Sequence, residues 1–174
     1  MLVYLETERL IIRDPIIEDF DAIWQMRNDE AVTKFTGGPT KLTRDEVYKR
    51  HVLRCGDFED RPKEYAVVLK EKNTYIGYCG FQYCQVLGDI ELLYGIARPF
   101  WKQGYGVEAA KAVLAFGIFD LKLSLVSAAV NYDNIASDKI LEAIGLTYVE
   151  DIDWPDQGRV KKYVVYSSDY IKIR

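Results

Sequence analysis

The chain has 174 residues, of which 49% are hydrophobic, including 13% aromatic, and 29% are charged. This is the length of one ordinary domain, and the apolar fraction is too high for a disordered chain, so we expect a single domain over residues 1–174. The 23 basic and 27 acidic residues give a formal charge of -4, which argues against binding to nucleic-acid phosphates.

Cysteine and histidine are scarce. Cys55, Cys79 and Cys84 form no Cys-x-x-Cys pair, and three thiols cannot all pair, so we expect reduced cysteines and a cytoplasmic location. The first residues do not resemble a signal peptide, and no apolar run reaches the roughly 18 residues of a membrane span, so we expect no membrane partner. His51 is the only histidine; it excludes a histidine-rich metal site, and its charged neighbours predict a surface residue.

The N-terminal third predicts one strand and two helices. Residues 9–13 are apolar and β-branched and end before a proline, which predicts a strand. Apolar residues then recur at helical spacing over 18–28, which predicts a helix. A second helix is expected over 43–55, because Thr43 and Glu46 have the spacing of a capping box.

Three β-rich segments follow in close succession, over residues 65–69, 75–81 and 89–96. A turn-like Lys-Asn-Thr sequence separates the first two. We therefore expect these segments to form an antiparallel meander.

The C-terminal part alternates helical and extended patterns. A long helical pattern begins at Gly104, and an apolar strand follows at 125–130, so we expect a βαβ unit with a right-handed crossover. A further helix over 135–144 should end at Gly145, a residue suited to a left-handed C-cap. Two closing strands should flank the turn at 156–158. Together these patterns predict one mixed α/β domain of the α+β type with a mostly antiparallel sheet.

Two glycines, Gly104 and Gly106, stand at the start of the long helix. Glycine lets the backbone approach a ligand, and a helix N-terminus offers N–H groups that lack intrahelical partners, so this segment indicates an anion site; a simple tight turn is the alternative. The residues also match the G-x-G-x-x-A dinucleotide pattern. However, the link from the preceding strand is too long, and Val126 and Ser127 stand about twenty residues on, where a ribose-binding carboxylate would be expected. We therefore do not expect nicotinamide binding.

Several segments occur together in a specific order that covers nearly the whole chain. They are Thr7-Glu8-Arg9-Leu10, Ile76-Gly77, Trp101-Lys102-Gln103-Gly104-Tyr105-Gly106-Val107-Glu108-Ala109, Asn131-Tyr132-Asp133-Asn134-Ile135-Ala136-Ser137 and Leu141-Glu142-Ala143-Ile144-Gly145-Leu146. In these segments the sequence resembles the GNAT superfamily of N-acetyltransferases, particularly its RimJ/RimL-like branch. The resemblance implies a mixed, mostly antiparallel central sheet of about six to seven strands flanked by about four helices.

The sequence departs from the family pattern at a few positions. Lys102 stands where glycine is usual, and it adds a cation near the expected pyrophosphate site. Leu93 stands at a glycine position and Gly95 at an aromatic one, which affects the acceptor side of the site. Trp101 is familiar in the RimJ/RimL-like branch.

The resemblance implies acetyl-CoA as co-substrate, no metal, and direct attack of a primary amine on the thioester carbonyl. Glu91 is the candidate base, acting directly or through water; the alternative is a cross-strand surface charge. Ser137 could donate a hydrogen bond to the departing sulfur; the alternative is a hydroxyl that satisfies its own helix turn.

The resemblance also implies a set of cofactor-binding residues. They are Tyr94, Ile96, Lys102, Gln103, Gly104, Tyr105, Gly106, Val107, Asn134, Ser137 and Lys139. Backbone groups of Tyr94 and Ile96 would pair with the pantetheine arm, and the Ile96 amide would support the oxyanion. Asn134 could equally be a helix N-cap, and Lys139 an ordinary exposed lysine.

The acceptor is expected to be a protein N-terminus or a small-molecule amine. The alternative functions are a catalytically silent coenzyme A binding module and an interaction protein that keeps the fold. The aromatic residues Trp24, Phe35, Tyr83 and Trp154 would either line the acceptor pocket or belong to the core. The sequence leaves the oligomeric state open, with a homodimer among the alternatives.

Overall fold

The computed structural model describes residues 2–55 and 63–173. The described residues group into two compact units. Of the described residues, unit 1 contains 2–55, 65–79 and 94–109, and unit 2 contains 63–64, 80–93 and 110–173. We describe each unit by itself.

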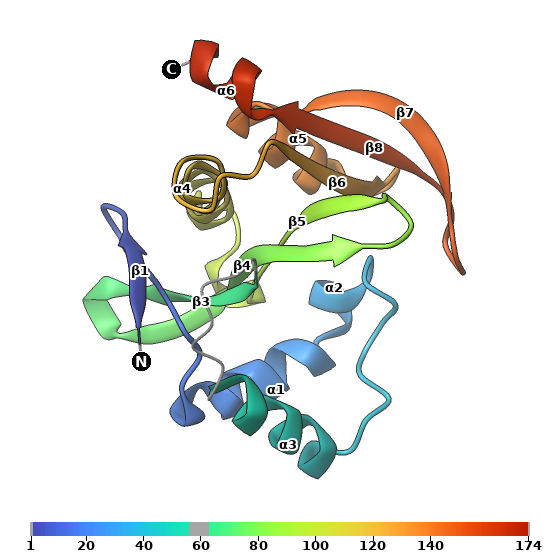
Figure 1. The fold of residues 1–174 in the computed structure, drawn as a ribbon. Coiled ribbons are helices and arrows are strands. Elements are labelled where there is room, and N and C mark those ends of the chain that lie inside the picture. Colours follow the sequence, from blue (N-terminus) through green and yellow to red (C-terminus); the bar gives the residue numbers. More distant parts are fainter. Residues whose placement is uncertain (1, 56–62, 174) are drawn as a thin grey trace. The chain divides into compact units, whose positions relative to one another are not determined.

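Strands form a mixed sheet, shown in Figure 1. They are β1 (Val3–Glu6), β2 (Leu10–Arg13), β3 (Glu64–Leu69), β4 (Thr74–Cys84), β5 (Asp89–Ile96), β6 (Leu125–Asn131), β7 (Thr147–Trp154) and β8 (Gly158–Tyr166). Their order is β1-β2-β3-β4-β5-β6-β8-β7. The pairs β1/β2, β2/β3, β6/β8 and β7/β8 are antiparallel, and β5/β6 is parallel. The expected mixed, mostly antiparallel sheet is confirmed, with eight strands in the described chain instead of about six to seven.

The helices differ widely in length. They are α1 (Phe20–Asn28), α2 (Glu30–Thr33), α3 (Arg44–Cys55), α4 (Tyr105–Phe119), α5 (Ile135–Ile144) and α6 (Ser167–Ile173), with 3-10 turns η1 (Ile17–Asp19), η2 (Lys70–Lys72) and η3 (Arg98–Phe100). The four longest, α1, α3, α4 and α5, are the four helices that the sequence patterns predicted. The patterns did not predict β1, α2 or α6, each of which has seven residues or fewer.

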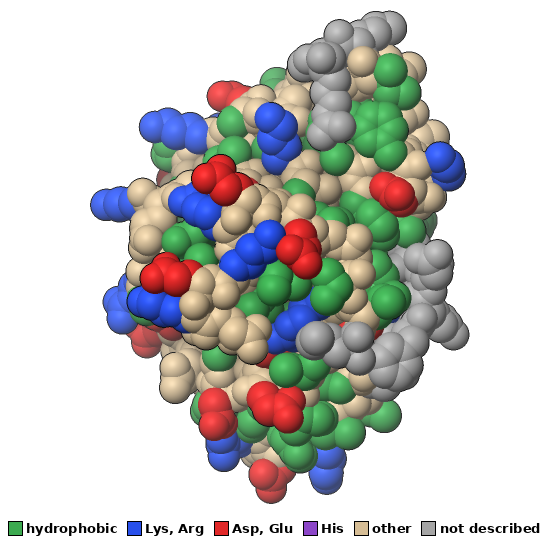
Figure 2. Space-filling view, turned by 90° about the vertical axis from the view of Figure 1, so that its left-hand side faces the viewer, with side chains coloured by type: hydrophobic (Ala, Val, Ile, Leu, Met, Phe, Trp, Pro, Cys, Tyr) green, Lys and Arg blue, Asp and Glu red, His purple; other side chains and the backbone are tan. Residues whose placement is uncertain are grey.

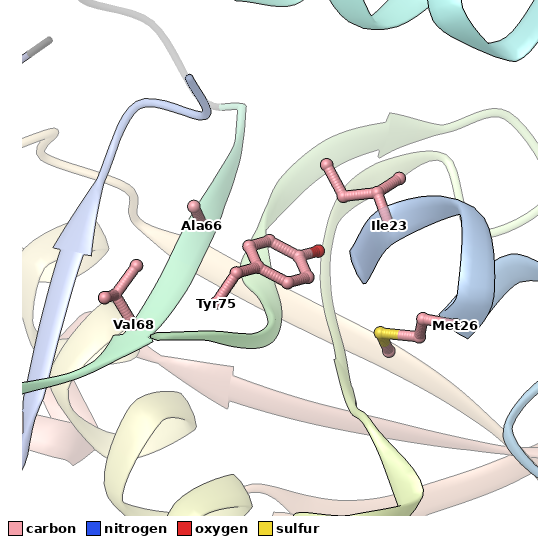
Figure 3. Packing of buried hydrophobic residues seen from close by; sticks show 5 residues of the cluster. All are labelled: Ile23, Met26, Ala66, Val68 and Tyr75. Atoms are coloured by element: carbon pink, nitrogen blue, oxygen red, sulfur yellow. The ribbon is translucent and has the colours of Figure 1, made fainter. Parts of the chain in front are cut away.

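The core of unit 1 packs α1 against β3 and β4. Ile23 and Met26 lie three residues apart, on one face of α1, and Figure 3 shows both beside the ring of Tyr75 on β4. Ala66 and Val68 of β3 belong to the same buried cluster. Removing this apolar surface from water holds α1 on the strands.

A buried ion pair fixes the turn from β2 into α1. Arg13 binds Asp19 in a bidentate arrangement, with N–O distances of 2.7 and 2.8 Å. The Asp19 carboxylate also accepts the N–H of Ile16 at 2.9 Å. Since both side chains are buried, each one depends on the other for compensation of its charge.

The surface position expected for His51 is wrong. Its side chain is only 4% exposed, and its Nε2 lies 2.8 Å from the carbonyl oxygen of Ile16. Val47 and His51 are one helical turn apart on α3 and both are buried, while the charged neighbours point elsewhere. The packing of α1 and α3 side by side explains this burial (Figure 1).

The predicted beginning of α3 is confirmed. The N–H of Thr43 donates to Glu46 Oε2 at 2.8 Å, and the N–H of Glu46 donates to Thr43 Oγ1 at 3.3 Å. This is a reciprocal capping box. The bonds from Thr43 lower the pKa of the Glu46 carboxyl.

Unit 2 combines β6, β8 and β7 with α5 and α6. The β6/β8 register runs from Leu125 opposite Tyr166 to Asn131 opposite Val160. On α5, the buried Asp138 accepts from Lys161 Nζ at 2.6 Å and from the Tyr163 hydroxyl at 3.1 Å, which ties the helix to β8. Burial, together with the hydrogen bond to Asp138, raises the pKa of Tyr163 to about 12.

The surface is mixed in charge. On the face that Figure 2 shows, acidic and basic side chains are interspersed among hydrophobic and neutral ones, so neither sign forms a continuous patch there. In the part of the chain that the structure describes, we find no helix long and apolar enough to cross a membrane. Cys55, Cys79 and Cys84 are not joined in disulfides.

Candidate functional site

The glycine-containing loop lies in unit 1, between η3 and α4. Two of its residues adopt left-handed backbone conformations, Lys102 with φ 60° and Gly104 with φ 81°. This region of φ favours glycine, the residue that the family pattern in the sequence analysis has where Lys102 stands. The side chain of Lys102 is exposed.

Helix α4 begins directly after Gly104. The N–H of Glu108 donates to the Gly104 carbonyl oxygen at 3.0 Å. The N–H groups of Tyr105, Gly106 and Val107 precede that bond, so they lie at the positive end of the helix dipole without a carbonyl one turn earlier in the helix. This geometry suits an anion such as a diphosphate.

Glu108, in the first turn of α4, binds the N-terminal segment. Its Oε1 accepts from the Thr7 hydroxyl at 2.5 Å and from the Arg9 N–H at 3.0 Å. Its Oε2 accepts from Arg9 Nε at 2.7 Å. Partial burial alone would raise the pKa of Glu108, but the bonds from Thr7 and Arg9 outweigh it and lower that pKa. The sequence patterns include Thr7, Arg9 and Glu108 but predict no contact among them.

The end of β5 lies next to the loop within unit 1. The indole N–H of Trp101 donates to the carbonyl oxygen of Ile96 at 2.5 Å. Tyr94, two residues earlier on β5, is half-buried. The roles of Tyr94 and Ile96 toward pantetheine stay predictions.

The structure explains the glycine at position 95. A Cβ built there would lie 2.7 Å from Cε1 of Tyr78 and 2.8 Å from Cε of Met26. The Tyr78 ring therefore occupies the space that an aromatic residue at position 95 would need. Gly77 is tighter still, because its Cβ would lie 2.1 Å from the backbone oxygen of Gly95.

Glu91 lies in unit 2, on β5, opposite Ser127 in the parallel pairing with β6. Its side chain accepts from Gln82 Nε2 at 3.0 Å. Glu91 is only 9% exposed, so it is not a surface charge. Burial raises the pKa of its carboxyl, and hydrogen bonds from Gln82, Cys84 and the Ala129 backbone partly oppose that rise. A carboxylate with a raised pKa is a stronger base than an exposed one.

The start of α5 carries the other predicted residues of unit 2. The Asn134 side chain is the N-cap and accepts from the N–H of Ser137 at 3.3 Å. Ser137 is half-buried and Lys139 is exposed. Gly145 ends the helix with φ 99°, as its sequence position predicted.

The predicted residues therefore divide between the units. The structure brings together Ile96, Lys102, Gln103, Gly104, Tyr105, Gly106 and Val107 in unit 1, with Tyr94 on the same strand as Ile96. Glu91, Asn134, Ser137 and Lys139 belong to unit 2, on β5 or at the start of α5.

Two further expectations concern aromatic residues and metal. Tyr83 is 67% exposed, and Trp24, Phe35 and Trp154 are half-buried, so none of these four belongs to the fully buried core. Within residues 2–55 and 63–173, no cluster of three His, Cys, Asp or Glu side chains is arranged to hold a metal ion.

Comparison with known proteins supplies a family. The model of the acetyltransferase (GNAT) domain matches residues 9–147. Over 143 residues, the chain is 30% identical to the uncharacterized N-acetyltransferase p20 of Bacillus licheniformis, and the match covers 80% of each chain.

Two solved structures share the fold. One is spermidine N-acetyltransferase from Vibrio cholerae in complex with CoA and spermine, with a TM-score of 0.76, 16% identity and coverage of 95% of this chain and 99% of that one. The other is RimL, a ribosomal L7/L12 alpha-N-protein acetyltransferase in complex with coenzyme A, with a TM-score of 0.79, 15% identity and coverage of 95% and 98%.

Proposed function

The chain belongs to the acetyltransferase (GNAT) family and is an acetyl-CoA-dependent N-acetyltransferase, and from this premise we propose that a primary amine attacks the thioester carbonyl directly, with Glu91 as base. The acceptor is a protein N-terminus or a small-molecule amine. The observation that carries the assignment is the burial of the Glu91 carboxylate, which raises its pKa.

In this proposal the diphosphate of the donor binds at the loop of unit 1. Tyr105, Gly106 and Val107 contribute N–H groups at the start of α4, and the exposed Lys102 adds a positive charge. Gln103 and Gly104 shape the turn. Tyr94 and Ile96 pair with the pantetheine arm, while Asn134 and Lys139 bind from α5.

The base matters because most amines are protonated at neutral pH. An α-amino group has a pKa near 8, so roughly a tenth is neutral at pH 7. A lysine-like amine has a pKa near 10.4, so its deprotonation costs about 4.6 kcal/mol at pH 7. Glu91 accepts this proton directly or through water, and an alkyl amine such as a polyamine gains more from it than a protein N-terminus does.

Ser137 donates to the coenzyme A sulfur as the thioester breaks. The departing thiol has a pKa near 8.5 and leaves readily as a thiolate, so this hydroxyl assists without being indispensable. The Asn134 cap, which binds the Ser137 N–H, fixes the turn on which that hydroxyl stands.

The finer classification is also a proposal. The segments Thr7-Glu8-Arg9-Leu10 and Trp101-Lys102-Gln103-Gly104 support the RimJ/RimL-like branch. The reduced cysteines Cys55, Cys79 and Cys84 support a cytoplasmic enzyme. We propose that residues 1–174 act as one acetyltransferase domain.

Amine-dependent release of coenzyme A tests the function. We expect release from acetyl-CoA with spermidine or with a short peptide that has a free N-terminus. Glu91→Gln should lower kcat about 100-fold or more, since general bases contribute at least that factor. The matched control Glu71→Gln removes an exposed carboxylate in η2 and should leave kcat unchanged.

Two results would contradict the proposal. Absence of coenzyme A release across a broad amine panel would favour a silent binding module. Full turnover by Glu91→Gln would show that the base is another group. Ser137→Ala should lower kcat by a smaller factor than Glu91→Gln does.

A further inference from the structure

One side chain of the N-terminal segment, that of Arg9, binds the glycine-containing loop of unit 1. Its Nε and Nη2 lie 2.7 and 2.6 Å from Glu108 Oε2. Its Nη1 donates to the backbone oxygen of Gln103 at 2.9 Å. Its guanidinium carbon lies 4.4 Å from the centroid of the Tyr105 ring. Arg9 therefore contacts both sides of Gly104 along the chain.

Gly104 itself lies against the same guanidinium. A Cβ at position 104 would lie 3.3 Å from Nη2 of Arg9. The planar fork of arginine can bind a carboxylate, a backbone carbonyl and an aromatic face at once, and the ammonium of lysine cannot reproduce that geometry.

The N-terminal segment that carries Arg9 is also fixed. The carbonyl oxygen of Arg9 accepts from the N–H of Lys70 at 2.9 Å. Lys70 Nζ donates to the carbonyl oxygen of Thr7 at 2.6 Å, and the Thr7 hydroxyl binds Glu108 at 2.5 Å. The loop and the start of α4 are thereby attached to the segments around β2 and η2 of unit 1 through hydrogen bonds that span 94 to 101 residues of sequence.

We propose that Arg9 is a positioning residue for cofactor binding, which holds the loop at Gln103 and Tyr105 so that the N–H groups at the start of α4 stand ready for the diphosphate. This inference rests on the proposed function. Glu108 neutralises the guanidinium, so Arg9 acts through the loop and not as a phosphate ligand. A loop already fixed in its binding conformation loses less entropy when the ligand binds.

Calorimetric titration with two ligands tests this role. Coenzyme A contains the diphosphate, and acetyl-pantetheine contains the thioester arm without it. For Arg9→Lys, which keeps the charge, we expect the Kd for coenzyme A to rise about tenfold, with an unchanged Kd for acetyl-pantetheine. If Arg9 contributed only its positive charge, the lysine variant would instead bind coenzyme A as the wild type does.

The matched control is Arg44→Lys. Arg44 also pairs with a carboxylate, that of Asp21, and lies 5.0 Å above the ring of Phe20, but it stands on α3. This variant should bind coenzyme A as the wild type does. Thr7→Val and Thr7→Ser supply a second pair: the valine variant should bind coenzyme A more weakly, and the serine variant, which keeps the hydroxyl, should restore binding.

The outcomes separate this inference from the proposed function. Wild-type protein that binds no coenzyme A would overturn the proposed function and this inference with it. Wild-type binding together with unchanged binding by Arg9→Lys and Thr7→Val would overturn the positioning role alone. Equal weakening of coenzyme A and acetyl-pantetheine would also overturn it, because a loop-specific role acts only on the diphosphate.

Discussion

Lys102 occupies a backbone conformation that side chains disfavour. With φ 60°, it has the left-handed geometry that costs a residue with a Cβ roughly 1 kcal/mol. The chain has lysine there, in an exposed position beside the start of α4. Stability alone would favour glycine at this φ, so the lysine is consistent with the cation proposed above for this loop.

Alanine normally gives a more stable protein than glycine, and we expect the opposite order of stability at position 102. We expect Lys102→Gly to be more stable than Lys102→Ala by about 1 kcal/mol, since only glycine adopts this φ without strain. At Lys111, an exposed residue inside α4, alanine should be more stable than glycine by about 1 kcal/mol. Urea unfolding of the four variants measures both differences, and the same order at both sites would refute the conformational explanation.

Glu91 links stability to pH. Burial raises its pKa above the ordinary value of 4.5, so the folded chain keeps this proton at pH values where the unfolded chain has lost it. Below 4.5 both states are protonated; as the pH rises through the raised pKa, the stability that the neutral carboxyl contributes is lost.

Glu91→Gln removes this titration. Relative to the variant, the wild type should lose free energy of unfolding between about pH 4 and about pH 8, by roughly 1.4 kcal/mol for each unit by which the pKa is raised. Urea unfolding at both pH values gives the difference. A wild type that gains stability over the variant across this interval would show that the pKa is lowered.

Strands β4 and β5 lie unusually close together in unit 1 at two glycines, Gly77 on β4 and Gly95 on β5. A Cβ on Gly77 would meet the backbone oxygen of Gly95 at 2.1 Å, and a backbone group cannot move aside. A Cβ on Gly95 would meet side-chain atoms of Tyr78 and Met26 at 2.7 and 2.8 Å. Both contacts are the far ends of side chains, which move at a lower cost than backbone: the Met26 methyl is flexible, and the Tyr78 ring must shift with it.

The two glycines should differ in their tolerance of alanine. We expect Gly77→Ala to lower the free energy of unfolding by about 3 kcal/mol or more, and Gly95→Ala by about 1 to 2 kcal/mol. Thermal or urea unfolding compares the two variants. Equal costs would mean that the strands separate as easily at one position as at the other.

The sequence predicted the elements that are long enough to show a repeating hydrophobic pattern. The four long helices, the strands of the meander and the C-caps and N-caps at Gly145 and Thr43 follow from local periodicity and capping chemistry. Helix α2 has four residues and β1 has four, so neither shows a period, and both depend on tertiary partners. The surface prediction for His51 was wrong because it relied on the charged residues beside it in the sequence. His51 follows Val47 by one helical turn, so both lie on the buried face of α3.

The sequence predicted only part of the candidate site. The resemblance identified the loop, whose motif is contiguous, and it supplied Glu91 as a single acidic position. The partnership of Arg9 with Glu108 spans 99 residues, and no local pattern links two oppositely charged residues at that distance. The left-handed φ of Lys102 was also hidden, because sequence patterns associate that conformation with glycine or asparagine.

For the whole molecule, binding of the cofactor to the folded state must raise the free energy of unfolding. A ligand at 100 times its Kd adds about 2.7 kcal/mol to the free energy of unfolding, which for a chain of this size shifts Tm by roughly 5 to 10 °C. We expect acetyl-CoA to produce this shift in a thermal unfolding assay, and adenosine, which lacks the diphosphate and the thioester arm, to produce none. An unchanged Tm with acetyl-CoA would favour an interaction protein that keeps the fold.

The hydrogen bond from Trp101 to Ile96 holds an indole ring, 40% exposed, beside the loop. Indole fluorescence shifts to shorter wavelength when water leaves the ring. A donor molecule that covers this loop would therefore shift the tryptophan emission to shorter wavelength. Rapid mixing would then give the rates of donor binding and release without any added dye.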